Sequence, residues 1–126
     1  MGLTSLHGQL NVSVLTELGF STRVAQIAAD ANEAVDAPEN QGSDARVTNL
    51  HAMRGFTNAR GLRGQMQTLE QGQAAVAALL SAAQQRVAEV IQSGQADREA
   101  AETLGAALHT VQDRVYHHFE PWPMNR

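Results

Sequence analysis

The chain has 126 residues, a formal net charge of −4 and no cysteine. This length predicts one domain, residues 1–126, with a core of its own, and the lack of cysteine excludes disulfide scaffolds, thiolate metal sites and cysteine nucleophiles. Acidic residues outnumber basic ones by thirteen to nine, so neither a broad nucleic-acid-binding surface nor a stable nucleic-acid complex is expected.

The longest nearly apolar run, residues 74–83, is far too short to span a bilayer. The first residues also lack the basic and apolar regions of a signal peptide. The sequence therefore predicts a cytoplasmic protein with no transmembrane segment.

Abundant alanine, with leucine and valine at helical spacing, predicts an all-α fold: a compact bundle of about four principal helices. The first helix is expected over residues 4–18 and ends at Gly19, which suits a left-handed stop. The second begins after Ser21, a typical N-cap residue, and its apolar side chains recur at steps of three and four as far as Val35.

Breaker residues predict two loops, at 36–48 and 54–64, separated by a short helical turn at 49–53. The longest helix is expected over 67–93 and the last over 97–119, where prolines stop it. No strand, internal repeat or nucleotide-binding motif is predicted. The apolar stripes of these helices give the expected core: Val24, Ile27, Leu79, Val87, Leu104, Leu108, Val111 and Val115.

The last predicted helix carries a polar stripe opposite its apolar one. His109, Asp113 and His117 follow one another at steps of four residues, so their side chains stack along one side of the helix. Such stacking lets two or three donors converge on one metal ion. A solvated polar face is the simpler interpretation.

Two observations favour a metal site over a solvated face. Gly105 and Ala106 lie beside the polar stripe, as small residues do where another element packs closely. Further histidine and carboxylate donors are expected near the ends of other predicted elements, namely His7, Asp36 and His51. Imidazole nitrogens and carboxylate oxygens are donors that zinc accepts when no thiolate is present.

The stretch from Leu104 to His117, with its His-x3-Asp-x3-His spacing, resembles the signature helix of zinc-dependent phospholipase C and P1-type nucleases. The upstream stretch from Leu18 to Asp36 is similar to the helix that delivers the first aspartate of that family. The fifteen-residue step from Asp36 to His51 also suits the family.

This resemblance implies a zinc-dependent hydrolase that acts on a phosphodiester or phospholipid substrate, with His109 and Asp113 as candidate catalytic residues. It implies one zinc ion with four ligands: Asp36, His51, His109 and Asp113. A second zinc would be held by His7, with Asp113 as a bridge. His117 would begin a third site, although the sequence has no second His-x3-acid motif to complete it.

Candidate substrate-binding residues lie in the second predicted loop and in the C-terminal tail. Arg54, Arg60 and Arg63 can grip a phosphate through forked hydrogen bonds, and a solvated loop is the alternative. Trp122 is the only tryptophan, and it is expected either to cap the core or to line a binding groove. With Phe119 it would form an exposed aromatic patch in a monomer, so a two-fold homodimer through the tail is expected.

A second interpretation keeps the helical scaffold and discards hydrolysis. In size and in its alanine-rich, lysine-free composition, the chain is similar to the small lysinoalanine-forming protein of duramycin/cinnamycin-type lanthipeptide clusters. That similarity implies a metal-free homodimer that binds a modified peptide and positions a lysine amine for addition to a dehydroalanine. A helical interaction module whose histidines are residual is the third possibility.

Overall fold

The computed structural model of the protein describes residues 6–17, 19–57, 64–93 and 97–122. Its elements follow in the order α1 (Leu6–Glu17), α2 (Thr22–Ala34), η1 (Pro38–Asn40), α3 (Ala45–Thr48), η2 (Asn49–His51), β1 (Phe56–Thr57), β2 (Gln65–Met66), α4 (Leu69–Ser93) and α5 (Asp97–His117). The predicted all-α fold is confirmed, with four long helices in these ranges. None of the helices there combines the length and apolar character of a membrane span.

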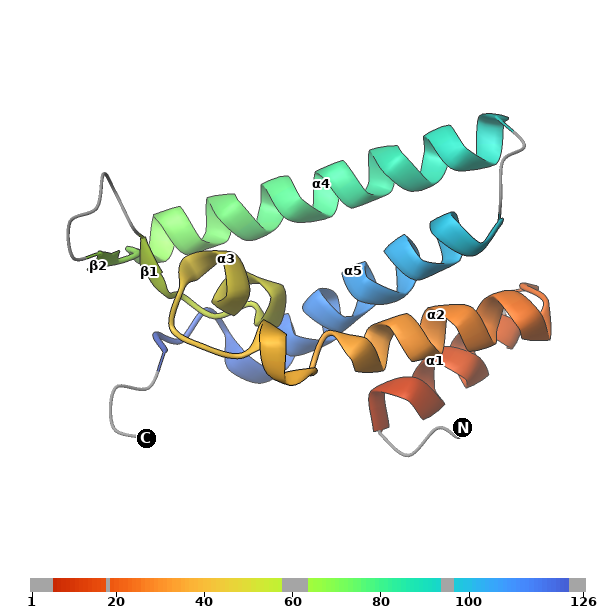
Figure 1. Cartoon of the computed structure of the whole chain (residues 1–126), viewed down its shortest axis with the longest axis horizontal. Coiled ribbons are helices and arrows are strands. Elements are labelled where there is room, and N and C mark those ends of the chain that lie inside the picture. Colours follow the sequence, from red (N-terminus) through yellow and green to blue (C-terminus); the bar gives the residue numbers. More distant parts are fainter. Residues whose placement is uncertain (1–5, 18, 58–63, 94–96, 123–126) are drawn as a thin grey trace.

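Helix α5 is the centre of the arrangement. Figure 1 shows it between α4 on one side and α2 on the other, and α5 contacts both of them. Helix α1 packs on α2. The short elements α3, β1 and β2 gather at the end of the molecule where α5 finishes (Figure 1). The C-terminal end of α5 is therefore surrounded by loops and short elements, a setting in which sites commonly form.

The predicted signals at the first two helices are confirmed. Gly19 has a φ of 99°, a left-handed conformation that glycine adopts without steric cost, and α1 ends just before it. The hydroxyl oxygen of Ser21 accepts a hydrogen bond from the backbone N–H of Val24 at 3.2 Å. Ser21 is therefore the N-cap of α2.

Two expectations about the loops are wrong. Strands β1 and β2 form a small antiparallel pair, with Phe56 opposite Met66, where no strand was expected. The first loop contains the short helices η1 and α3, and the Asp44 carboxylate caps α3 by accepting a hydrogen bond from the Arg46 N–H at 2.8 Å. These elements are too short for a side-chain period to reveal them in the sequence.

The last helix also ends earlier than expected. Helix α5 stops at His117, because His118 and Phe119 adopt left-handed backbone conformations with φ angles of 52° and 59°. Such angles are uncommon for residues other than glycine and need support from surrounding contacts. The turn after α5 therefore depends on what the tail packs against.

The tail docks on the segment that follows η2. The backbone N–H of Phe119 donates to the Ala52 carbonyl at 3.0 Å, and the Arg54 N–H donates to the Glu120 carbonyl at 2.8 Å. The Trp122 N–H returns a bond to the Arg54 carbonyl at 2.8 Å. Phe119 and Trp122 are thus half-buried within their own chain, and the homodimer stays a prediction.

The expected core is only partly correct. Leu15, Ala25 and Ala28 form a buried cluster, against which the half-buried Leu104 and Leu108 pack. Ile27 is buried as predicted, but the prediction that Val115 is buried is wrong, since 71% of it is exposed. The other predicted core residues are half-buried rather than buried: Val24, Leu79, Val87 and Val111.

The predicted core is only partly correct because α5 buries a different stripe of residues from its apolar one. Four of its buried residues follow steps of four, namely Ala101, Gly105, His109 and Asp113, and Ala100 and Thr110 beside them are buried as well. A Cβ atom on Gly105 would lie only 2.0 Å from the carbonyl oxygen of Ala28, so the backbones of α2 and α5 are in direct contact. Leu104 and Leu108 flank this contact. Toward the C-terminal end of α5, the buried stripe consists of the polar residues His109 and Asp113.

We expect Gly105→Ala to lower the free energy of unfolding by about 1–3 kcal/mol, because the added methyl group must push α2 away from α5. Val115→Ala on the same helix is the control and should change it by no more than about 0.5 kcal/mol, because Val115 is exposed. Urea unfolding measures both changes. Equal effects would contradict the assignment of the buried stripe.

Candidate metal centre

Two histidines and two aspartates from three parts of the chain meet beside the C-terminal half of α5. His109 and Asp113 stand one turn apart on α5, His51 ends η2, and Asp36 follows α2. The Asp113 Oδ2 atom lies 2.9 Å from His109 Nε2 and 3.1 Å from His51 Nδ1. The Asp36 Oδ1 atom lies 3.4 Å and 3.5 Å from the same two nitrogens.

These four His–Asp distances are close to the spacing of neighbouring ligand atoms around a zinc ion. Zinc bonds of about 2.0–2.1 Å place neighbouring ligand atoms about 3.3 Å apart, and the four measured edges run from 2.9 to 3.5 Å. Within the described part of the chain, Asp36, His51 and His109 form a group whose ligand atoms all lie within 4.8 Å of one another. This group can hold a metal ion. Asp113 does not belong to the group, although its Oδ2 atom contacts both histidines.

The outer ring nitrogens of the histidines are held by oxygens that only accept hydrogen bonds. His51 Nε2 lies 3.0 Å from the backbone carbonyl of Asn40, and His109 Nδ1 lies 2.8 Å from Oδ1 of Asn32. A proton on the outer nitrogen of either ring would be donated to this oxygen. In a neutral ring the inner nitrogen then presents a lone pair, which is how ligating histidines are prepared for a metal.

The cluster lies largely out of water, apart from one member. His109, Asp113 and His51 are only 0%, 4% and 7% exposed, whereas the side chain of Asp36 is 53% exposed. Carboxylates so close to inner lone pairs require a proton or another cation between the facing atoms.

The electrostatics of His51 reflect this requirement. Burial by itself lowers the pKa of His51, but the hydrogen bonds to Asp113 and the Asn40 carbonyl, with the negative charges of Asp113 and Asp36, together raise that pKa above its ordinary value. The cluster therefore favours positive charge at its centre.

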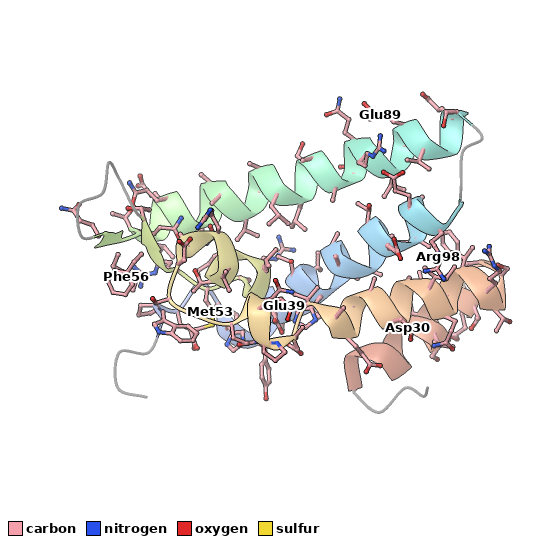
Figure 2. All side chains as sticks on the ribbon, viewed as in Figure 1. Asp30, Glu39, Met53, Phe56, Glu89 and Arg98 are labelled. Atoms are coloured by element: carbon pink, nitrogen blue, oxygen red, sulfur yellow. The ribbon has the colours of Figure 1, made fainter. Side chains whose placement is uncertain are left out.

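A cavity of about 270 Å³ opens beside the cluster. Its wall includes Met53, which Figure 2 labels near the end of the molecule that carries β1, β2 and the tail. Asp36, the exposed donor, reaches the cluster from this side. The residues that line the cavity are Asp36, Gln41, Gly42, Thr48, His51, Met53, Asp113, Tyr116, His117 and Trp122.

Two hydrogen bonds help to place the donors that come from outside α5. The Asn40 side chain donates to the Ala34 carbonyl at 3.2 Å, which folds the segment after α2 back on the helix end. The Thr110 hydroxyl donates to the Leu50 carbonyl at 2.8 Å, which ties η2 to α5. Both bonds hold backbone next to a donor, so hydrogen bonds help to fix the loops around the cluster.

The other candidate ligands lie outside this cluster. His117 lines the cavity, but its Nδ1 atom lies 3.2 Å from the Glu120 carboxylate, and it does not belong to the described group of converging donors. The side chain of His7 lies outside what the structure describes, so its expected role remains a prediction.

Of the candidate substrate-binding residues that the structure describes, Arg54 and Trp122, only Trp122 lines the cavity. The Arg54 guanidinium instead donates to the carbonyls of Phe119 at 2.8 Å and Gln67 at 3.2 Å, so it fastens the tail to the rest of the fold. Arg60 and Arg63 lie outside the described residues.

Sequence reasoning missed the residues that hold the histidines in place. Asn32 is fully buried, and its side-chain amide also donates to Gln112 Oε1 at 3.2 Å. An asparagine inside a helix is disfavoured by propensity, and Asn32 lies four residues after Ala28 on the buried face of α2. A disfavoured polar residue at a position whose spacing matches the buried face of α2 was the sequence feature that could have indicated this role.

Comparisons of the chain with protein-family models, characterised proteins and solved structures give no significant match. The resemblance to zinc-dependent phospholipase C and P1-type nucleases therefore stays a prediction. The geometry of the cluster and its cavity is the basis for the function proposed next.

Proposed function

We propose that the protein is a zinc-dependent hydrolase of phosphodiesters. One observation carries the proposal: the inner nitrogens of His51 and His109 face Asp36 and Asp113 across 2.9–3.5 Å, while the outer ring nitrogens are tied to acceptor oxygens. Two neutral imidazoles and two carboxylates form a donor set that suits zinc.

The residues of the cluster have separate tasks in this proposal. His51, His109 and Asp113 are buried donors with little freedom to move. Asp36 directs Oδ1 toward the histidines and is half exposed, which leaves its Oδ2 atom to accept a proton from water in the cavity. Zinc, when bound, supplies Lewis acidity that polarises a phosphoryl oxygen and activates water at neutral pH.

The cavity is what favours catalysis over a purely structural role. Four protein donors complete a tetrahedral structural site, whereas a catalytic zinc also needs access for water or substrate. Three members of the cluster line the cavity, namely Asp36, His51 and Asp113, and Asp36 is the exposed one. A substrate oxygen can therefore approach from that side.

The cavity also favours a compact substrate. Its volume of about 270 Å³ lies just below the usual range of small-molecule sites, about 300–1,000 Å³. Tyr116 and Trp122 contribute aromatic surface, and the described lining residues include no arginine or lysine. A small phosphodiester with a neutral or cationic neighbour, such as a phospholipid head group, suits this lining better than a polyanion.

The test is metal analysis of the purified protein combined with hydrolysis assays. We expect one zinc ion at this centre, and hydrolysis of bis(p-nitrophenyl) phosphate and p-nitrophenylphosphorylcholine that a chelator abolishes and added zinc restores. Bound zinc without hydrolysis of either diester would indicate a structural metal site and would contradict the proposed enzymatic activity. A protein that binds no metal would contradict the whole proposal and leave the metal-free peptide-binding interpretation.

A further inference from the structure

We infer that Asn32 is a positioning residue: it fixes the neutral His109 ring with its proton on Nδ1, so that Nε2 is ready to bind the metal before the metal arrives. The functional role of Asn32 as a positioning residue rests on the proposed zinc centre. The proton position itself is a property of the metal-free protein and is tested there.

The contacts of Asn32 support this role directly. Asn32 and His109 are both 0% exposed, and Asn32 Oδ1 lies 2.8 Å from His109 Nδ1. No water reaches this bond, so its geometry is set by the packing of α2 on α5. The close backbone contact at Gly105, one turn before His109, keeps the two helices near enough for the bond to form.

Gln112 keeps the Asn32 amide in the required orientation. The Asn32 Nδ2 group donates to Gln112 Oε1 at 3.2 Å. If the Asn32 amide were flipped, its oxygen would face the Gln112 oxygen, and its NH2 group would face His109 Nδ1. With Gln112 Oε1 facing Asn32 as in the structure, the first of these contacts would set one acceptor against another. This orientation of Gln112 therefore favours the proton on Nδ1.

The alternative tautomer is a real competitor. Asp113 Oδ2 lies 2.9 Å from His109 Nε2, so the negative charge of this carboxylate favours a proton on that nitrogen. That tautomer would turn the ligand nitrogen into a donor, and a histidine nitrogen must be unprotonated to bind a metal. Asn32 therefore acts against Asp113 in setting where the proton resides.

The experiment locates this proton by long-range 1H–15N correlation spectra of metal-free protein labelled in histidine, at about pH 9, well above the ordinary histidine pKa of about 6.5. His109→Gln identifies the signals of His109. We expect the proton on Nδ1 in the wild-type protein, on Nε2 in Asn32→Leu, and again on Nδ1 in Asn32→Asp, which keeps an acceptor oxygen.

Zinc titration provides the second measurement. Asn32→Leu should weaken zinc binding by about 10–100-fold, as loss of such outer-shell partners commonly does, whereas Asn32→Asp should stay within a few-fold of wild type. Gln67→Leu is the matched control, because Gln67 is also a buried amide but bonds Asn49 and Gly55. It should lower stability and leave both the His109 spectrum and the zinc affinity unchanged.

If the spectra of the wild-type protein place the proton on Nε2 of His109, the inference is overturned. This measurement needs no variant, so the inference can be tested even if Asn32→Leu fails to fold. An unchanged His109 spectrum in folded Asn32→Leu would overturn it as well. These outcomes are distinct from failure of the proposed function: the spectra need neither zinc nor hydrolysis, and hydrolysis can persist with either result.

Discussion

Asp113→Asn is expected to lower phosphodiester hydrolysis by about a thousandfold or more. The Asp113 Oδ2 atom lies within 3.1 Å of the inner nitrogens of both histidines, so this carboxylate is the donor shared by the whole cluster. The amide preserves size and removes the charge that holds a cation there. Metal-ion stabilisation of a transition state is worth several kcal/mol, and each 1.36 kcal/mol is a factor of ten in rate.

Zinc affinity should fall in the same variant by more than about a hundredfold, the upper end of what the loss of an outer-shell partner costs. The matched control is Glu102→Gln, which makes the same change of charge on the same helix. Glu102 is exposed and pairs with Arg98, so hydrolysis and zinc binding should stay within about twofold of wild type. Wild-type zinc affinity in folded Asp113→Asn would contradict the four-donor centre.

Much of the helical framework could be predicted because its signals are local. The Ser21 cap and the Gly19 stop act within one turn of the chain, so composition and spacing reveal them. The His-x3-Asp spacing also reports a local fact, that His109 and Asp113 face the same way on α5. The structure brings both of them to Asp36 and His51, which the family resemblance had grouped together.

The orientation of α5 could not be predicted, because hydrophobic periodicity assumes that the apolar stripe is the buried one. Here the buried stripe contains Gly105, His109 and Asp113. Its burial is possible because the glycine lets two backbones touch and because hydrogen bonds satisfy the polar side chains. Val115, placed in the core by its period, is exposed as a result.

The turn after α5 was hidden for a different reason. His118 and Phe119 are held in left-handed conformations, which neither residue prefers in isolation. Their support comes from the hydrogen bonds of the tail to Ala52 and Arg54. These partners are more than sixty residues away in the chain, so no local pattern indicates them.

Zinc is expected to reverse the effect of pH on stability. In the metal-free protein the pKa of His51 is raised by its hydrogen bonds and by the two aspartates, so the folded state binds a proton more tightly than the unfolded state does. This contribution to stability is fully present below the unfolded pKa of about 6.5 and is lost as the pH rises through the higher folded pKa.

Bound zinc has the opposite dependence, because its histidine ligands must be unprotonated and its affinity therefore increases with pH. Thermal unfolding between about pH 5 and 8, with zinc and with chelator, should give curves that converge at low pH and separate as the pH rises. His51→Gln should remove the slope that His51 contributes to the metal-free curve and most of the separation.

His118→Asn is the control for this experiment, since His118 is exposed and asparagine tolerates its left-handed backbone. It should leave both the slope and the separation unchanged. Curves that stay parallel across the range would contradict zinc binding through His51. A metal-free protein whose His51-dependent stability increased with pH would contradict the raised pKa, and with it the inference that the cluster favours positive charge at its centre.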